Sequence, residues 1–293
     1  SPENTAVLWL GDNVYEYGFP PRDEQGCRED WAQERIDGEA VLRRQIDASG
    51  RSAAILFVPG NHEWRAAGKC AVGRHQAEAA FVDEASDHRA ALLPTTPCPG
   101  PVTREAGGFL LVAFNSEWLL REDARLVPAC AAELGLAPEA SYKEARAAFM
   151  ARLGSLLAQA NGRPVVLASH HPLRSHGDHG ASFLRAQFLG QDLRSRRYRR
   201  LRRDLGALLQ TALGKDDKLF VLFAAGHDHD LQILSEPGSP RLVHLVSGSA
   251  SKLTGVDQGA DTRFAVKRHG YMRLDLVETS AGRGLFLAAI AVD

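Results

Sequence analysis

Residues 8–15 read LWLGDNVY, in which an apolar run ends at Gly11 and the carboxylate of Asp12 and the phenol of Tyr15 follow three residues apart. This pattern is typical of the carboxyl end of a buried strand that opens into a binding loop, because open α/β sheets bind their ligands at that edge. The stretch therefore predicts a strand over residues 6–10, followed by a functional loop.

The same pattern recurs at three further apolar runs. They are residues 54–58 before PGNHEW, residues 164–168 before SHHP and residues 219–225 before GHDH. Four strands that each end in Asp, Asn or His indicate one polar site at one edge of a sheet.

The composition is that of an ordinary globular chain. It has 293 residues, of which 44% are hydrophobic and 24% charged, and this is long enough for a full core. We expect a single domain over residues 1–293, because the four polar segments must converge. The formal net charge of -1 gives no general attraction to nucleic acid, and no apolar run reaches the length of a membrane span. We therefore expect neither a specific nucleic-acid partner nor a transmembrane segment in this chain.

The four cysteines, Cys27, Cys70, Cys98 and Cys130, do not pair at metal-binding spacing, so a zinc–thiolate site is not expected. An even count in loop-like stretches suits two disulfides and an extracytoplasmic protein, whereas four unrelated thiols would suit a cytosolic one. We predict a periplasmic or secreted location, with the cytoplasm as the alternative.

Hydrophobic periodicity predicts helices that alternate with the strands. The expected helices span about residues 31–48, 75–92, 141–161 and 193–213, and a further buried strand spans residues 109–114. Residues 126–139 are expected to be irregular. Short antiparallel or mixed strands are expected at residues 231–234, 242–246, 271–277 and 285–291.

Seven arginines fall within residues 194–203. They form either the solvated face of an amphipathic helix or a basic wall near the site that steers a phosphorylated or polyanionic substrate. Both interpretations remain open from the sequence.

The candidate ligands combine oxygen and nitrogen donors without sulfur, which favours iron, manganese or zinc. They are Asp12, Tyr15, Asn61, His170, His227 and His229. His227 and His229 lie on alternate residues and can diverge toward two ions, and the two oxygens of Asp12 can bridge those ions. Two metals about 3.5–4 Å apart can hold both the attacking and the leaving oxygen of phosphoryl transfer.

These motifs resemble the calcineurin-like metallophosphoesterases. The matching residues are Gly11-Asp12-x-x-Tyr15, Gly60-Asn61-His62-Glu63, His170-x-Pro172 and Gly226-His227-x-His229. Tyr15, the longer match GHDHDLQIL at 226–234, and the spacing from His170 to His179-Gly180 resemble the small, tartrate-resistant type of purple acid phosphatase. The resemblance implies an α/β fold, a four-layer α-β-β-α sandwich of two mixed sheets with helices on both outer faces. The N-terminal strand of the family, with its Asp-x-His or Asp-x-Gly, is missing here, which we interpret as a truncation.

Carried over residue by residue, the resemblance makes Asp12 the bridging ligand. Tyr15 and His229 would then bind the first metal, ferric iron in the purple type, and Asn61, His170 and His227 the second, which would be iron, zinc or manganese. His62 would contact the phosphate and protonate the leaving group, and His179 would be a second histidine near the substrate. His171 is expected to have a supporting or structural role.

The function implied is a dimetal-dependent phosphoric ester hydrolase, an acid-phosphatase-like phosphomonoesterase. In it a metal-bound hydroxide attacks phosphorus while a histidine assists the leaving group, and the substrate is a phosphorylated small molecule or protein. The alternatives are a phosphodiesterase of the same fold and a non-catalytic member that binds phosphate or a partner.

Overall fold

The computed structural model describes residues 4–22, 30–52, 54–65, 69–181, 193–280 and 282–292. The contacts within the chain divide it into two compact units. The first unit contains residues 1–106, 112–151 and 168–170, and the second contains residues 107–111, 152–167 and 171–293.

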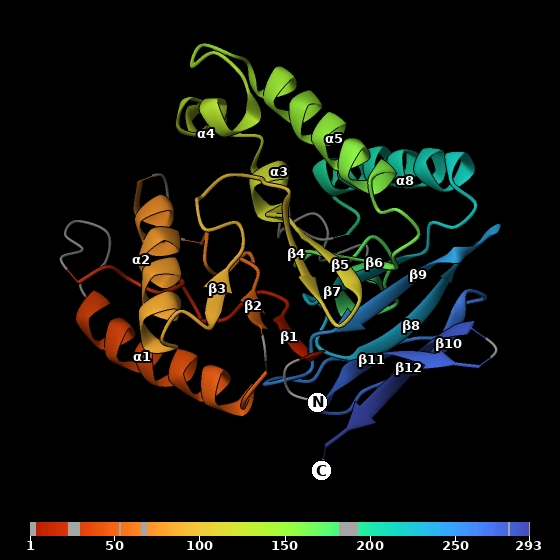
Figure 1. The fold of residues 1–293 in the computed structure, drawn as a ribbon. Helices are drawn as coiled ribbons and strands as arrows, with labels where there is room; N and C mark the ends of the chain where they lie inside the picture. The colour runs from red at the N-terminus through yellow and green to blue at the C-terminus, as the bar shows by residue number, and fades with distance from the viewer. Residues whose placement is uncertain are drawn as a thin grey trace. The chain divides into compact units, whose positions relative to one another are not determined.

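The first unit begins with a parallel three-stranded sheet that is covered by two helices. The strands are β1 (Ala6–Trp9), β2 (Ala54–Phe57) and β3 (Ala90–Leu92), and the helices are α1 (Trp31–Ala48) and α2 (Lys69–Ala85). The sheet order is β1-β2-β3, with Leu8 beside Leu56 and Leu56 beside Ala91. Helices α1 and α2 lie beside this sheet (Figure 1). Leu42 of α1, Phe81 of α2 and Phe57 of β2 belong to one buried hydrophobic cluster. The polar segments after β1 and β2 therefore lie at one edge of this sheet.

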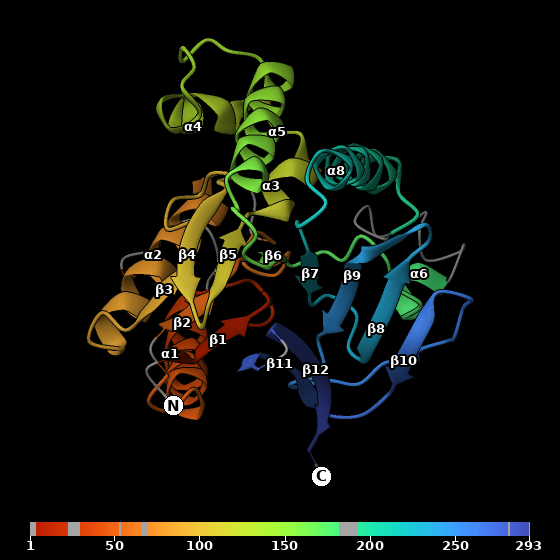
Figure 2. The same ribbon diagram turned by 45° about the vertical axis from the view of Figure 1, so that its right-hand side comes forward.

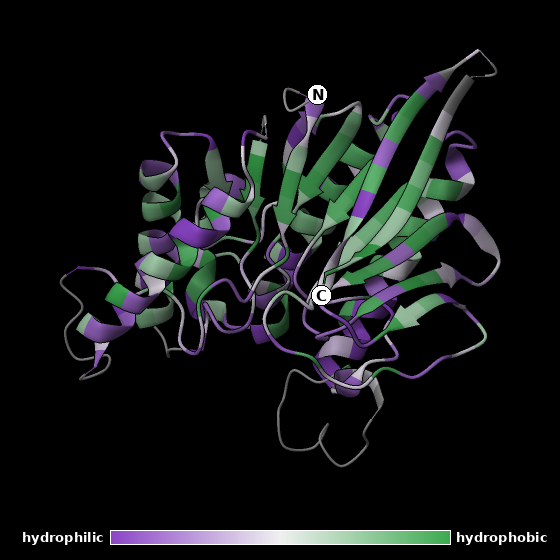
Figure 3. Cartoon of the chain, turned by 90° about the horizontal axis from the view of Figure 1, so that it is seen from below, coloured by the Kyte–Doolittle hydropathy of each residue, from purple (hydrophilic) through white to green (hydrophobic). Residues whose placement is uncertain are grey.

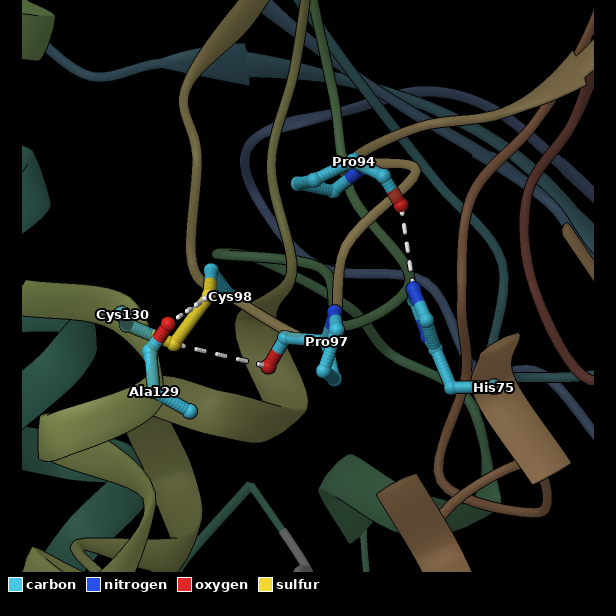
Figure 4. Close-up of a disulfide and its surroundings, with 6 residues drawn as sticks. All are labelled: His75, Pro94, Pro97, Cys98, Ala129 and Cys130. Carbon is cyan, nitrogen blue, oxygen red and sulfur yellow. Dashed lines mark hydrogen bonds between the residues drawn. A yellow bond between two sulfur atoms is a disulfide. The ribbon is translucent and has the colours of Figure 1, made fainter. Parts of the chain in front are cut away.

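The next part of the first unit is helical and is held by a disulfide. Its helices are α3 (Ser116–Arg121), the 3₁₀ turn η2 (Ala124–Leu126), α4 (Val127–Leu134) and the start of α5 (Tyr142–Ala158). Cys98 bonds to Cys130 across 32 residues, and the imidazole of His75 contacts the carbonyl of Pro94 in the same loop (Figure 4). Closing a loop of this length stabilises the fold by about 4 kcal/mol in the chain-entropy model.

The largest sheet has seven strands in the order β10-β8-β9-β7-β6-β5-β4. These strands are β4 (Val102–Ala106), β5 (Phe109–Ala113), β6 (Val165–Ala168), β7 (Val221–Ala225), β8 (Leu231–Glu236), β9 (Ser239–Ser247) and β10 (Thr262–Val266). The pair β7 and β9 is parallel, whereas β8 is antiparallel to both β9 and β10. The sheet is therefore mixed, and β5, β6 and β7 are buried along their whole length.

The second unit also contains α6 (Asp178–Ala181), α8 (Arg196–Lys215) and the antiparallel pair β11 (Gly270–Thr279) and β12 (Gly282–Ala291). Helix α8 lies alongside β7 and β9 (Figure 2) and buries one apolar face. The guanidinium of Arg241 donates hydrogen bonds to the carbonyls of Leu213, Asp216 and Leu219, which fixes the turn between α8 and β7.

The expected fold class is confirmed, since the chain is a mixed α/β protein with a large mixed sheet and helices. Figure 3 shows the physical basis, because the strands are mainly hydrophobic and the helices carry both hydrophobic and hydrophilic residues. Within the described residues, no helix is both long and apolar enough to span a membrane.

Several boundaries differ from the expectation. The helix expected over 75–92 begins at Lys69 and ends at Ala85, because Asp87 and His88 adopt positive φ, and residues 90–92 then form β3. Residues 127–134, expected to be irregular, form α4, which has a proline in its first turn and ends at Gly135 with φ +70°. Strand β10 was not expected at all.

The cysteines also differ in part from the expectation. Cys70 lies in α2 and Cys130 in α4, so these two are on helices and not in loops. Cys70 and Cys130 nevertheless both form disulfides, as expected if the four cysteines form two disulfides and not four free thiols. Cys27 lies outside the described residues.

Candidate metal centre

In the first unit, two glycines bring the candidate ligands close together. Gly11 and Asp12 adopt φ +90° and +56° directly after β1, so the chain turns sharply at the strand end. A Cβ atom on Gly11 would lie 2.5 Å from Nδ1 of His170, and one on Gly60 would lie 2.3 Å from Oδ1 of Asp12. Only glycine allows this approach of backbone to ligand, which explains the Gly-Asp and Gly-Asn motifs.

Three donor atoms converge at this edge. Nε2 of His170 lies 3.0 Å from Oδ1 of Asn61 and 3.3 Å from Oδ2 of Asp12. The other ring nitrogen, Nδ1, lies 2.8 Å from the carbonyl oxygen of Leu10 and must donate its hydrogen, because a carbonyl only accepts. A backbone carbonyl that orients an imidazole in this way is typical of histidine ligands to metals, since it presents the lone pair of Nε2.

The ionisation of this group shows that it accommodates a positive charge. Burial by itself lowers the pKa of His170, but the carboxylate of Asp12 and the hydrogen bond to it raise the pKa to about 8. For Asp12 the effects are reversed. Burial raises the pKa of this carboxyl group, but the charges of His170 and His62 have the larger effect and lower the pKa well below its usual range. A proton on His170 therefore occupies the place between nitrogen and oxygen donors that a cation would take.

Tyr15 belongs to the same group. Its hydroxyl donates to Oδ2 of Asp12 at 3.2 Å, and its ring lies 4.2 Å from that of His62. Burial and the charges of Asp12 and Glu63 raise the pKa of Tyr15 well above its usual range. The phenol is therefore protonated in the metal-free protein, and only a cation beside it would favour the phenolate.

His62 is fixed at both its backbone and its ring. Its N–H donates to Oδ1 of Asp12 at 3.0 Å, and Nδ1 donates to the carbonyl of Glu16 at 2.8 Å. Nε2 then carries the lone pair and lies 3.9 Å from Oδ2 of Asp12. Burial lowers the pKa of His62 below 6.5, although Asp12 acts in the opposite direction. This imidazole is neutral at pH 7 and becomes a proton donor in acid.

Glu63 is a supporting residue to which the sequence reasoning gave no role. It is fully buried, and its carboxylate accepts hydrogen bonds from the backbone N–H groups of Asp12, Val14 and Gly60 at 3.1, 3.1 and 2.6 Å. Burial and the charge of Asp12 raise the pKa of Glu63 to about 7. Glu63 therefore joins the loops after β1 and β2. In the sequence, this supporting role was indicated only by the position of Glu63 directly after His62.

In the second unit, the candidate histidines form a cluster of rings. The ring of His227 lies 4.5 Å from that of His171 and 4.3 Å from that of His179, and His179 lies 6.5 Å from His229. His171, His227 and His229 are all buried, and ring nitrogens of His171 and His227 come within 4.8 Å of each other. His171, expected to be supporting, is thus as close to His227 as the predicted site residue His179.

A buried carboxylate, that of Asp228, accepts hydrogen bonds from the segment that carries His179. Asp228 lies between the two histidines of the GHDH motif and is fully buried. Its Oδ1 accepts the backbone N–H of His179 at 2.9 Å, and its Oδ2 accepts the hydroxyl of Ser175. The fit is close, because a Cβ atom on Gly177 would lie 2.4 Å from the carboxyl carbon of Asp228. Asp228 therefore fixes the segment that carries His179 to the strand end that carries His227 and His229.

A polar network extends this support. The side-chain amide of Gln232 donates to the hydroxyl of Ser175 at 2.8 Å and to Asp230 at 2.7 Å, and its oxygen accepts the N–H of His176 at 2.8 Å. Asp230 is fully buried, and its pKa is raised to about 7, chiefly by burial. The loop over 175–179 is therefore hydrogen-bonded to the start of β8.

No protein-family model matches this chain, and no curated protein matches its sequence. Solved structures do match. The chain is similar to GAP50, described as the anchor in the inner membrane complex of Plasmodium, with 14% identity, a TM-score of 0.58, and coverage of 98% of this chain and 74% of that one. It is similar to PhoD with 15% identity, a TM-score of 0.50, and coverage of 97% and 63%.

A third structure is purple acid phosphatase PPD1 from seeds of yellow lupin (Lupinus luteus), with 13% identity, a TM-score of 0.48, and coverage of 98% and 44%. The chain thus spans 63% of the PhoD chain and 44% of the lupin chain. The chain shares its fold with GAP50 and PhoD. At such low identity the likeness concerns the fold alone, so the chemistry must be argued from the residues described above.

The donor set fits divalent or trivalent metal ions. Carboxylate, amide and phenol oxygens surround His170 in the first unit, and imidazoles gather in the second, with no thiolate in either. Such mixed oxygen and nitrogen ligands suit iron, manganese and zinc.

Proposed function

We propose that this protein is a dimetal-dependent phosphoric ester hydrolase that acts as an acid-phosphatase-like phosphomonoesterase. The observation that carries the proposal is the convergence of Asp12 Oδ2 and Asn61 Oδ1 on Nε2 of His170, at 3.3 and 3.0 Å, at the end of two neighbouring parallel strands. Three donors of different chemistry that meet at one nitrogen atom, with His170 buried and Asp12 and Asn61 half-buried, are expected of a metal site.

In this proposal, Asp12 would be a ligand to both ions. Tyr15 and His229 would bind the first, which would be iron, and Asn61, His170 and His227 would bind the second, which would be iron, zinc or manganese. The two metals would supply Lewis acidity, neutralising the phosphate oxygens and lowering the pKa of water to about 7.

The side chains of this chain hold and protonate the substrate. The Nε2 atom of His62, whose Nδ1 is engaged with Glu16, is available to bind a phosphate oxygen and to give a proton to the leaving alkoxide. His179, whose backbone is held by Asp228, would contact the phosphate from the second unit. Because the pKa of His62 is lowered, the protonated form exists mainly in acid. The proposal therefore expects an acidic optimum.

Two alternatives remain within reach of one experiment. A phosphodiesterase would use the same ligands and differ in its loops. A non-catalytic member is favoured by one observation, the shared fold with GAP50, which is described as an anchor. A non-catalytic member would bind metal or phosphate without turnover.

The test is hydrolysis of an aryl phosphate monoester and of a bis-aryl phosphate diester after loading with iron, zinc or manganese. We expect the monoester to be hydrolysed faster, and we expect Asp12→Asn and His227→Ala to lower turnover and the metal content, with the larger loss in Asp12→Asn. His88→Ala is the matched control, because the side chain of His88 is 80% exposed and contacts only Asp83 among the described pairs. Full activity of Asp12→Asn would refute the ligand set, whereas metal binding without turnover of either ester would favour the non-catalytic alternative.

We also propose a periplasmic or secreted location. The support is the disulfide between Cys98 and Cys130, because such bonds persist in oxidising compartments.

A further inference from the structure

The exposed face of α8 carries an unusually dense positive charge. Six of its first eight residues are arginines, and at 100° per residue Arg196, Arg199, Arg200 and Arg203 lie on one stripe, here called the arginine face. The opposite stripe, which includes Tyr198, is buried. Arg196, Arg199 and Arg203 are exposed. From Arg196 to Arg203 the arginine face is about 10 Å long.

This arrangement costs the helix stability. The arginines occupy the N-terminal half of α8, where the helix dipole is positive and favours carboxylates. Arg196 with Arg200 and Arg199 with Arg203 are like-charged i,i+4 pairs, which repel. Residues 193–203 contain no acidic residue, and Asp204, which follows this run, accepts a hydrogen bond from Nε of Arg203 at 2.9 Å. A face that served only solubility would mix both signs of charge.

The arginine face is tied to the candidate site within the second unit. Nε of Arg194 donates to the carbonyl of Gly180 at 2.9 Å, and Gly180 directly follows His179. Helix α8 begins two residues after Arg194, where Ser195 caps it by accepting the N–H of Tyr198 at 3.2 Å. The first turn of the arginine face is therefore close to the segment that presents His179.

We infer that the arginine face binds multiply phosphorylated small molecules and that these form the preferred substrate class of the neighbouring site. This inference rests on the proposed phosphatase function. Guanidinium groups bind phosphate through two parallel hydrogen bonds, and a row of them about 10 Å long matches several phosphates better than one. A local field of this kind also raises the association rate of polyanions.

Two other polyanions fit the arginine face less well. The only aromatic residue of α8 is Tyr198, which is buried, so the helix offers no surface for stacking bases. The apolar stripe of α8 packs into the protein, so the helix has no apolar side to insert into a membrane. Small polyphosphates require neither feature.

The test compares two triple variants that each remove three positive charges. The first replaces Arg196, Arg199 and Arg203 by Gln. The matched control replaces Arg44, Arg51 and Arg104, which are exposed arginines of the first unit, by Gln. Gln is a good helix former, so α8 should persist, and the loss of repulsion should leave the unfolding temperature of the first variant equal or higher.

Two readouts are measured on the whole chain. Binding of inorganic tripolyphosphate is followed by calorimetry, and kcat/KM is measured for tripolyphosphate and for an aryl monophosphate at low and high salt. We expect the first variant to lose about 10-fold or more of tripolyphosphate affinity and of kcat/KM at low salt, with less than about 2-fold change for the aryl monophosphate. The control should keep both values, and the loss should shrink at about 1 M salt, where the Debye length is about 3 Å.

Equal effects of the two variants, or none, would overturn the inference. So would selective binding to vesicles with 30% phosphatidylserine or to a 20-nucleotide single strand without binding of tripolyphosphate. If the protein hydrolysed no phosphate ester, the proposed function would fail, but the calorimetry would still test the arginine face on its own.

Discussion

The two clusters of candidate ligands, one in each unit, are organised differently. In the first unit Nε2 of His170 lies 3.3 Å from Oδ2 of Asp12 and 3.0 Å from Oδ1 of Asn61, and the carboxylate of Asp12 raises the pKa of His170 to about 8. In the second unit the rings of His171 and His179 lie 4.5 and 4.3 Å from that of His227 at tilted angles, and Asp228 accepts hydrogen bonds from the N–H of His179 and the hydroxyl of Ser175. The cluster in the first unit is positioned by contacts between its candidate ligands, whereas hydrogen bonds to the supporting carboxylate of Asp228 position the segment of His179 in the second unit.

This difference indicates how each cluster should respond to change. A site that is held by contacts between its ligands loses its geometry when one ligand is removed. A site that is held by its supporting residues tolerates a lost ligand better than a lost support. Four predictions follow that contrast, beginning with the largest effect.

Removal of a ligand should be most damaging in the first unit. Asp12→Asn should lower kcat of the metal-loaded protein by more than about 100-fold, beyond the 10–100-fold typical of outer-shell residues, because it removes the charge of the proposed bridging ligand and the ionic partner of His170. His171→Ala, in the second unit, should cost less than 10-fold on the same scale. Steady-state kinetics with metal analysis measures both. Equal losses would mean that the two clusters are organised alike.

Filling the close contact at Gly60 should destabilise the fold. In Gly60→Ala the new Cβ atom would lie 2.3 Å from both N and Oδ1 of Asp12, so we expect a loss of about 3 kcal/mol in the free energy of unfolding and reduced metal content. Gly50→Ala is the control, because it has φ +60° but no atom within 4 Å, and it should cost about 1 kcal/mol. Denaturant unfolding separates the two, and similar losses would rule out the steric explanation.

Removal of the support should matter most in the second unit. Asp228→Ala frees both the N–H of His179 and the hydroxyl of Ser175, so kcat should fall by about 10–100-fold. Asp228→Asn keeps an acceptor for His179 and should restore most of the rate, because its role is positional. The profile of rate against pH should keep its shape in both variants. A shifted profile, or an Asn variant as poor as the Ala variant, would assign Asp228 a direct chemical role.

The smallest effect concerns the proton in the first unit. Because the folded-state pKa of His170 is about 8 against 6.5, its contribution to stability is complete below pH 6.5 and is lost as the pH rises through about 8. We expect the metal-free protein to lose about 2 kcal/mol of unfolding free energy over that range. His170→Gln should lack this component, and added zinc should remove it, since the ion replaces the proton. A dependence that persists in His170→Gln would assign it to another group.

Local sequence chemistry predicted much of the fold. Helix α1 spans residues 31–48 as expected, and in α5 the carboxylate of Glu144 accepts the N–H of Ser141 at 2.8 Å, the capping box that the spacing indicated. The apolar runs before Gly11, Gly60 and Gly226 are strands, as expected, because a short continuous apolar segment that ends at a glycine is typical of a strand in an α/β sheet. Helix α4 and strand β3 were not predicted. Their boundaries are set by single residues with positive φ, Gly135 after α4 and Asp87 and His88 before β3, and hydrophobic periodicity does not reveal such turns.

The sequence by itself predicted which residues bear the proposed chemistry, because Asp, Asn, His and Tyr after apolar runs offer the oxygen and nitrogen ligands that iron, manganese and zinc prefer. Tertiary structure decided how they are held. The loop joint at Glu63, the support by Asp228 and the pairing of His170 with Asn61, 109 residues away, depend on side chains that meet only after folding. A pattern along the chain records composition and spacing, whereas a hydrogen bond between distant residues depends on how strands are ordered in a sheet.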